Sequence, residues 1–159
     1  MGKQPFYIPT AKDLRTEFVH LGIMDTGYKV SDLMNENVLT VTSNTTLRSC
    51  AKVMATKKIG SVIVQEGKKV VGILTEQDLA RKVVAQGVDA DDSVVAEVMS
   101  KKLVTIMPSD DVYTAMVRMS KYNIKHLPVM KGEQLVGILT VKDIIRANPT
   151  LLEKMNVER

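Results

Sequence analysis

Hydrophobic positions recur with a helical period in two segments of this 159-residue chain. From Leu47 to Met54, apolar side chains follow the spacing i, i+3, i+4 and i+7, which places them on one face of a helix. The same spacing returns between Val112 and Met119. A Thr-Thr pair stands before the first stripe and a Ser-Asp-Asp run before the second, and both are typical of helix starts. The pattern therefore predicts two amphipathic helices.

Runs typical of strands lie between the helical patterns. Residues 61–75 and 126–140 each contain two mostly apolar runs separated by a turn, at 66–68 in the first segment and around Gly132 in the second. Such runs indicate strands that are covered on both faces. A shorter β-branched run at 38–41 predicts another strand ahead of the first helix. Each segment is therefore expected to form a β-hairpin.

Further helices are predicted on either side of these strands. Residues 76–87 continue the first hairpin with a helical pattern that ends at a glycine, a residue typical of helix C-termini. Residues 141–147 follow the second hairpin in the same way. Short helices are expected at 30–34 and 95–99. The order of elements is thus β-α-β-β-α, found twice, with a short helix before each unit.

The chain repeats itself at an offset of 65 residues. The stretch VVGILTEQDLAR at 70–81 returns as LVGILTVKDIIR at 135–146, and 14 of the 53 positions from 30 to 82 match those 65 further on. Such a repeat fixes the architecture before anything else. We therefore predict an α/β (α+β) fold of two duplicated β-α-β-β-α units. Because units of this size bury too little surface to be stable alone, they are expected to pack sheet to sheet about a pseudo-twofold axis and share one core.

The duplication also sets the expected boundaries along the chain. The N-terminal extension carries an amphipathic pattern from Thr10 to His20, which predicts a short extra helix. The linker between the repeats is too short to separate independent domains. The expected segments are an extension at 1–29, a first repeat at 30–87, a linker at 88–94, a second repeat at 95–147 and a tail at 148–159.

Composition narrows the class of protein. A hydrophobic content of 45% and a charged content of 25% are normal for a globular chain. No apolar run approaches the roughly 20 residues of a membrane helix, and the N-terminus does not resemble a secretory signal. The single Cys50 excludes an intrachain disulfide and fits a buried position. We therefore expect a cytoplasmic protein without membrane contact.

Charge permits an anionic ligand. The net charge of +4 suits a nucleotide or a nucleic acid. The Lys and Arg residues are scattered in pairs, however, and the chain is poor in the aromatic residues on which single strands stack. Nucleic acid is therefore an unlikely partner.

The motif T-x-x-D appears at Thr75–Asp78 and again at Thr140–Asp143. The simplest interpretation is a capping box at each helix start, where a cap contributes about 1 kcal/mol. The alternative uses the same geometry for a ligand, because amides at a helix start favour an anion and a short carboxylate one turn later accepts hydrogen bonds from ribose hydroxyls. Capping boxes prefer Glu or Gln at the third position, and Asp stands there twice. Both interpretations stay open.

The element order, the G-I-L-T-x-x-D motif that closes each copy and the K-H-L-P-V run at 125–129 resemble the tandem cystathionine β-synthase (CBS) domain pair. The likeness covers residues 30–147. It implies that clefts between the repeats bind adenine nucleotides, of the AMP, ADP or ATP class, or related adenosyl ligands. It also implies a regulatory, energy-sensing module that acts on a partner protein of unknown identity. No metal and no cofactor besides the nucleotide ligand is expected.

The resemblance further implies which residues line the clefts, because each cleft combines T-x-x-D of one repeat with the first two strands of the other. In the first cleft, Thr75 and Asp78 are expected to face Val104, Lys125, His126 and Pro128. In the second, Thr140 and Asp143 are expected to face Thr40, Gly60 and Ser61. Only the first cleft receives the basic pair, so it is expected to be the better phosphate site.

The same residues also bear on other functions. An enzyme is disfavoured, because the sequence has two histidines, one cysteine and no metal-binding or phosphate-loop motif. A dimerisation or scaffold module with empty clefts remains an alternative, as does nucleic-acid binding. A homodimer is expected in either case, since four helical side chains would otherwise leave an exposed apolar patch. These are Val83, Val84, Ile144 and Ile145.

Overall fold

A computed structural model describes residues 26–149, so the helix predicted from Thr10 to His20 lies outside the described residues. The first half of the fold carries a three-stranded sheet in the order β1-β2-β3. Strand β1 runs parallel to β2, and β2 forms an antiparallel hairpin with β3. The elements are β1 (Thr40–Val41), α3 (Leu47–Lys57), β2 (Ser61–Glu66), β3 (Lys69–Thr75), α4 (Glu76–Asp78) and the π-helix η1 (Leu79–Val84).

The second half repeats this order with one strand fewer. In the part of the chain that the structure describes, its sheet contains only the antiparallel pair β4-β5. The expected first strand is reduced to a single bridge between Ile106 and Val129. In the first half, the Ile63 amide donates to the Leu39 carbonyl at 3.1 Å; Pro128 stands at the equivalent position and has no amide hydrogen to donate. The elements are α6 (Val112–Tyr122), β4 (His126–Lys131), β5 (Gln134–Thr140) and α7 (Val141–Ala147).

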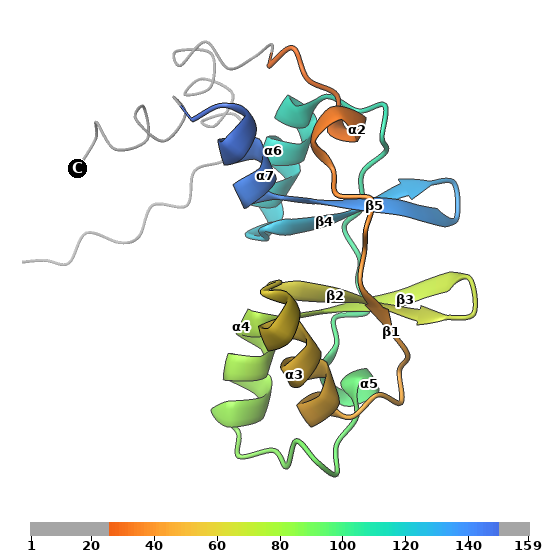
Figure 1. Cartoon of the computed structure of the whole chain (residues 1–159), viewed down its shortest axis with the longest axis vertical. Helices are drawn as coiled ribbons and strands as arrows, with labels where there is room; N and C mark the ends of the chain where they lie inside the picture. The colour runs from red at the N-terminus through yellow and green to blue at the C-terminus, as the bar shows by residue number, and fades with distance from the viewer. Residues whose placement is uncertain (1–25, 150–159) are drawn as a thin grey trace, which may run out of the picture.

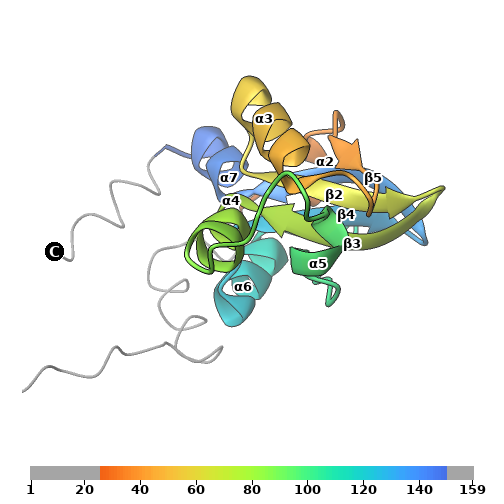
Figure 2. The ribbon, with the colours of Figure 1, turned by 90° about the horizontal axis from the view of Figure 1, so that it is seen from below.

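The two sheets face each other across the middle of the molecule, and the helices cover their outer faces (Figures 1 and 2). Val62 and Val64 point to the helices of their own half, where they join a buried cluster. Because side chains alternate along a strand, Ile63 points to the opposite sheet, and it is completely buried. Pro128, its counterpart, is buried too. The sheet-to-sheet packing predicted from the duplication is confirmed.

Each half has its own hydrophobic core, so the expectation of one shared core is wrong. The short helix α5 (Val95–Val98) opens the second repeat in sequence, but Val95 and Val98 are buried in the core of the first half. Conversely, Val30 of α2 (Val30–Leu33) is buried in the core of the second half. The repeats thus exchange their first helices, and this exchange joins them into one unit.

Backbone pairing fixes the exchange at two equivalent places. Asn35 and Ile138 each donate an amide to the other's carbonyl, at 2.9 and 3.0 Å, and Ser100 and Ile73 do the same at 2.9 and 3.1 Å. The chain then crosses between the halves at 36–39 and at 101–104.

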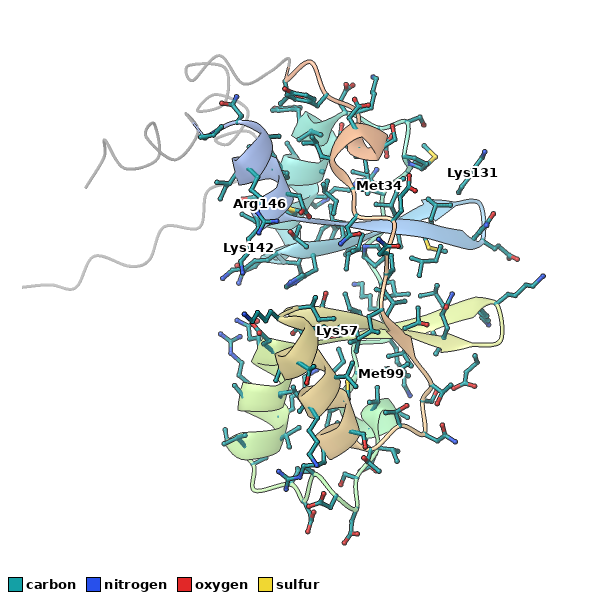
Figure 3. All side chains as sticks on the ribbon, viewed as in Figure 1. Met34, Lys57, Met99, Lys131, Lys142 and Arg146 are labelled. Carbon is teal, nitrogen blue, oxygen red and sulfur yellow. The ribbon has the colours of Figure 1, made fainter. Side chains whose placement is uncertain are left out.

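The glycine of the repeated V-G-I-L-T motif makes room for this crossing. A Cβ atom on Gly72 would lie 2.6 Å from Sδ of Met99 and 3.1 Å from the Ser100 carbonyl oxygen. On Gly137 it would meet Met34 in the same way, at 2.7 Å. Met34 and Met99 each follow one of the exchanged helices (Figure 3). The glycine of the motif is therefore explained in both copies by close packing, independently of any ligand.

The segment 88–94, predicted as a linker between the copies, folds against the first half. The amide of Leu47 donates to the Ser93 carbonyl at 3.0 Å, and the guanidinium of Arg48 forms an ion pair with Asp91 at 3.0 Å. The segment separates the copies in sequence, but the crossing to the second half comes only after α5, because α5 still belongs to the first core.

The helix predicted at 76–87 is regular only at its start. After α4 the chain widens into the π-helix η1, in which amides bond to carbonyls five residues earlier, for example Ala85 to Ala80 at 3.0 Å. The segment ends near Gly87, which has a positive φ of 66°. The equivalent α7 is an ordinary α-helix, so the two copies differ at this point.

The prediction that four helical side chains form an exposed apolar patch is wrong for two of them. Val83 and Ile144 are buried in the two cores, because the helix faces that carry them pack on the sheets. Val84 is 78% exposed, and Ile145 is partly buried. Within residues 26–149, no helix combines the length and the apolar character needed to cross a membrane.

Candidate functional site

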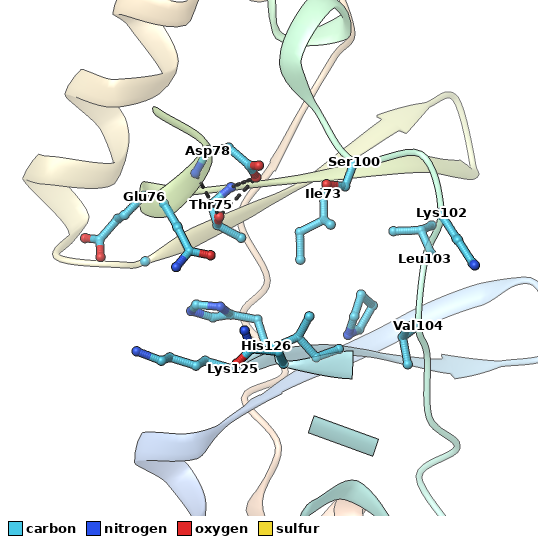
Figure 4. Close-up of a pocket in the computed structure, with 15 residues that line it drawn as sticks. Ile73, Thr75, Glu76, Asp78, Ser100, Lys102, Leu103, Val104, Lys125 and His126 are labelled. Carbon is cyan, nitrogen blue, oxygen red and sulfur yellow. Dashed lines mark hydrogen bonds between the residues drawn. The ribbon is translucent and has the colours of Figure 1, made fainter. Parts of the chain in front are cut away.

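A cleft of about 290 Å³ opens between the two halves and is lined from both of them (Figure 4). The first half contributes the end of β3 and the start of α4. The second half contributes the chain before β4 and the start of that strand. All six residues predicted for the first cleft line it, namely Thr75, Asp78, Val104, Lys125, His126 and Pro128. The fold therefore brings together residues from three separate parts of the sequence.

Thr75 and Asp78 form the predicted capping box. Oδ2 of Asp78 accepts from the Thr75 amide and from the Thr75 hydroxyl, both at 3.0 Å, while the Asp78 amide donates to Oγ1 of Thr75 at 3.3 Å. The simpler interpretation of the motif is thus realised. It leaves the second carboxylate oxygen of Asp78, Oδ1, outside the cap.

That second oxygen distinguishes the two copies. Oδ1 of Asp78 lies 2.7 Å from Nζ of Lys82. Thr140 and Asp143 form the same cap, with bonds of 2.7 and 2.8 Å to Oδ2. Alanine at 147 takes the place of Lys82, and no ion pair to Asp143 is found among residues 26–149. Among the described residues, the motif aspartate of the first copy is therefore the only one of the two with a cation on it.

The helix start has fewer free backbone amides for binding an anion than the sequence suggests. The amide of Glu76 donates to the Gly60 carbonyl at 3.0 Å, and the equivalent amide of Val141 donates to Lys125 at 3.1 Å. The expectation of free amides at this helix start is therefore wrong for its first residue. A phosphate in the cleft would depend on side-chain cations instead.

His126 lies at the point where the halves meet. Burial lowers the pKa of its imidazole below the ordinary value, nearby Glu76 raises it, and Lys125 and Lys142 lower it further. A Cβ atom on Gly60 would lie only 3.0 Å from Nε2 of His126. Gly60, which was predicted for the second cleft, lines the first one. It stands against the imidazole because β2 and β4 begin side by side on the facing sheets.

The burial of His126 predicts a pH dependence of stability. Since the pKa is lower in the folded state than in the unfolded chain, where it is about 6.5, the unfolded chain takes up the proton first as pH falls. Stability is thus fully present above that pH and decreases below it. We expect the wild type to lose more free energy of unfolding between about pH 7.5 and about pH 5.5 than His126→Ser. Urea unfolding measures this, and equal losses would contradict it.

The residues predicted for the second cleft are placed as follows. Ser61 begins β2, is buried, and stands opposite Thr75 in the strand register. Thr40 begins β1 and is exposed. At the 65-residue offset, the counterpart of Val104 is Leu39, which precedes Thr40 in the chain.

Several cleft residues were missed by the sequence reasoning. Glu76 occupies a variable position within T-x-x-D, and Lys102 and Leu103 precede Val104 on the crossing segment. No motif marks the crossing segment, because its role depends on the helix exchange. The T-x-x-D motif itself did contain the signal for Glu76, since the first turn of a helix that starts at a cleft also lines it.

Comparison with known proteins identifies relatives. The family model described as CBS domain matches residues 30–85 and 95–149. The chain is 32% identical over 111 residues to the mitochondrial CBS domain-containing protein CBSX3 of Arabidopsis thaliana, a match that covers 67% of this chain and 54% of that protein. The chain therefore spans about half the length of this curated relative.

Solved structures share the fold. A conserved protein from Pyrococcus horikoshii is 26% identical, with a TM-score of 0.73 over 78% of this chain and 94% of that one. The CBS domain pair of protein MJ0100, in complex with 5′-methylthioadenosine and S-adenosyl-L-methionine, is 31% identical, with a TM-score of 0.68 over 75% and 98%. With the family model matched over both repeats, the chain belongs to the CBS domain family and carries two such domains in tandem.

Proposed function

We propose that the cleft between the halves binds an adenosine-containing ligand and that Asp78 accepts hydrogen bonds from its ribose hydroxyls. The observation that carries the proposal is a carboxylate, only 13% exposed, at the rim of a cleft with an apolar wall. Ile73, Leu103 and Val104 supply apolar surface for a base. The cleft volume is close to the range of about 300–1,000 Å³ of small-molecule sites. The ligands of MJ0100 are both adenosyl compounds.

The charges of the cleft favour a ligand with few phosphates. Lys102 and Lys125 line it and suit an anion, whereas Glu76 and Asp78 oppose one. Like charges close together in a partly buried site repel each other. We therefore infer a preference for AMP or an adenosyl compound over ATP. Lys125 and His126 are the residues that would meet a single phosphate.

A regulatory role follows from the position of the cleft. Since both halves line it, a ligand contacts elements that cross between them, and its binding free energy changes how firmly the halves are held together. We infer that the protein senses the level of this ligand, as an energy-sensing module does, and transmits its occupancy to a partner protein. Catalysis is not part of the proposal. Within residues 26–149 the one histidine, His126, lines the cleft, whereas the one cysteine, Cys50, is buried in a core, so the two do not form a catalytic pair in the cleft.

A thermal-shift panel with AMP, ADP, ATP, S-adenosylmethionine and NADH tests the function. A ligand at 100 times its dissociation constant adds about 2.7 kcal/mol, which raises the melting temperature by several degrees for a domain of this size. Shifts with adenosyl ligands are expected. If none of them shifts the melting temperature at millimolar concentration, the capping boxes are only caps and the scaffold alternative is favoured.

We further propose that the protein is a homodimer. Val84 and Tyr122 remain exposed on helical elements, at 78% and 45%, and an interface through these helices would remove their apolar surface from water. Sedimentation equilibrium at micromolar concentration is expected to give about twice the chain mass of 17.6 kDa. A single species at the mass of one chain would contradict the proposal.

A further inference from the structure

The ammonium of Lys82 contacts both the motif aspartate of the cleft and the end of α5. Its Nζ lies 2.7 Å from Oδ1 of Asp78 and donates to the Val98 carbonyl oxygen at 2.9 Å. An ammonium has three donors and no acceptor, so two of its three hydrogen bonds are accounted for. The Lys82 side chain is 45% exposed while that of Asp78 is 13% exposed. A cation from the solvent side therefore reaches the carboxylate that the ligand is proposed to use.

The second contact leads to the opposite wall of the cleft. Val98 is the last residue of α5. Two residues later Ser100 pairs with Ile73 of β3, and the chain then runs past Lys102 and Leu103 along one side of the pocket (Figure 4). Lys82 thus connects Asp78 to Val98, which lies just before the segment that forms this wall.

We propose that Lys82 is a ligand-sensitive latch; this inference rests on the proposed adenosine site. In the empty cleft, Lys82 holds Oδ1 of Asp78 and the end of α5 together. Ribose hydroxyls that donate to Asp78 compete with the ammonium for the same carboxylate. Ligand binding then weakens the hold of Lys82 on Asp78 and loosens its connection to α5. The signal of an occupied cleft reaches the crossing segment in this way.

Within residues 26–149, the second copy has no such latch. Ala147 occupies the position equivalent to Lys82, and its methyl group forms no ion pair. The aspartate of that copy keeps the same cap without the competing cation. The difference makes the first cleft the one that couples binding to a change in α5.

Thermodynamic linkage gives the size of the effect. If the bound ligand weakens the contact between Lys82 and Asp78, that contact weakens ligand binding by the same factor. Removing the ammonium is therefore expected to tighten adenosine binding about twofold to fivefold, the factor supplied by an exposed ion pair. Adenosine is the appropriate probe because it carries no phosphate, so the lost positive charge does not weaken its binding directly.

The test compares Lys82→Met with Lys68→Met. Methionine keeps the apolar stem of Lys82 and removes the ammonium. Lys68 is exposed in the turn between β2 and β3, so its replacement makes the same charge change away from the cleft. Isothermal titration with adenosine is expected to show tighter binding for Lys82→Met only. Without ligand, hydrogen exchange of residues 95–104 is expected to be faster in Lys82→Met than in the wild type and Lys68→Met.

The outcomes separate the latch from the proposed function. If neither the wild type nor Lys82→Met binds adenosine, the proposed function fails. If both bind it equally well and exchange of residues 95–104 is unchanged, the site stands and the latch is refuted. Weaker binding by Lys82→Met also overturns the latch, since Lys82 would then assist the ligand.

Discussion

Replacing Asp78 by alanine is expected to weaken adenosine binding by roughly tenfold to a hundredfold. A hydrogen bond to a charged group contributes about 1.5–3 kcal/mol, and each 1.4 kcal/mol is about a factor of ten in the dissociation constant. The variant loses the carboxylate that faces the cleft, while the apolar wall and the two lining lysines, Lys102 and Lys125, remain. Titration calorimetry with adenosine measures the change.

Lys125→Ala is expected to weaken AMP binding and to leave adenosine binding nearly unaffected, because the contact of Lys125 is with phosphate.

Asp143→Ala is the matched control, because it removes the same capping carboxylate from the other copy. Both variants are expected to lose about 1 kcal/mol of stability without ligand, as caps do. Only Asp78→Ala is expected to lose affinity in the first cleft. If Asp78→Ala lowers the melting temperature and binds adenosine as tightly as the wild type, Asp78 is a cap alone and the proposed site loses its central residue.

Replacing Gly72 by alanine is expected to destabilise the fold by about 1–3 kcal/mol, the usual cost of overpacking. The new Cβ would lie 2.6 Å from Sδ of Met99, which can rotate away, and 3.1 Å from the backbone oxygen of Ser100, which cannot. The strand β3 would have to move away from the crossing segment. The free energy of unfolding in urea measures the loss, and the cleft is expected to bind adenosine less tightly.

A double-mutant cycle with Met99→Ala tests the contact directly. If the methionine is part of the clash, the second substitution costs less in the Gly72→Ala background than in the wild type. Glycine to alanine at an unstrained, open site stabilises by about 0.4–1 kcal/mol through the unfolded chain. A Gly72→Ala variant that is more stable than the wild type would therefore contradict the close packing of the exchanged segment.

Local patterns identified most of the elements. The apolar stripes from Leu47 and Val112 became α3 and α6, and the two glycine-centred turns became hairpins at Gly67 and Gly132, both with positive φ. These features depend on the period of nearby residues and on backbone conformation at single positions, which the sequence contains directly. The repeated T-x-x-D motif likewise formed the two capping boxes.

The exchange of α2 and α5 could not be predicted in this way. Each helix has only four residues, and so short a segment fits either of two duplicated sheets. Which sheet the helix packs on depends on the space above Gly72 and Gly137. It also depends on backbone hydrogen bonds between distant residues, about 27 positions apart for Ser100 with Ile73 and about 103 for Asn35 with Ile138. The two separate cores and the position of the crossing segments follow from that choice.

The sequence by itself determined the duplication and the family resemblance, because these rest on identity and spacing along the chain. The resemblance in turn implied six residues of one cleft. Only the tertiary structure decided that Gly60 and Glu76 join that cleft, that the amide of Glu76 is already bonded, and that Lys82 reaches Asp78 and Val98 together. The physical reason is that a cleft wall and an ion pair depend on which surfaces meet. In two copies of one unit, that is settled by packing between segments far apart in the chain.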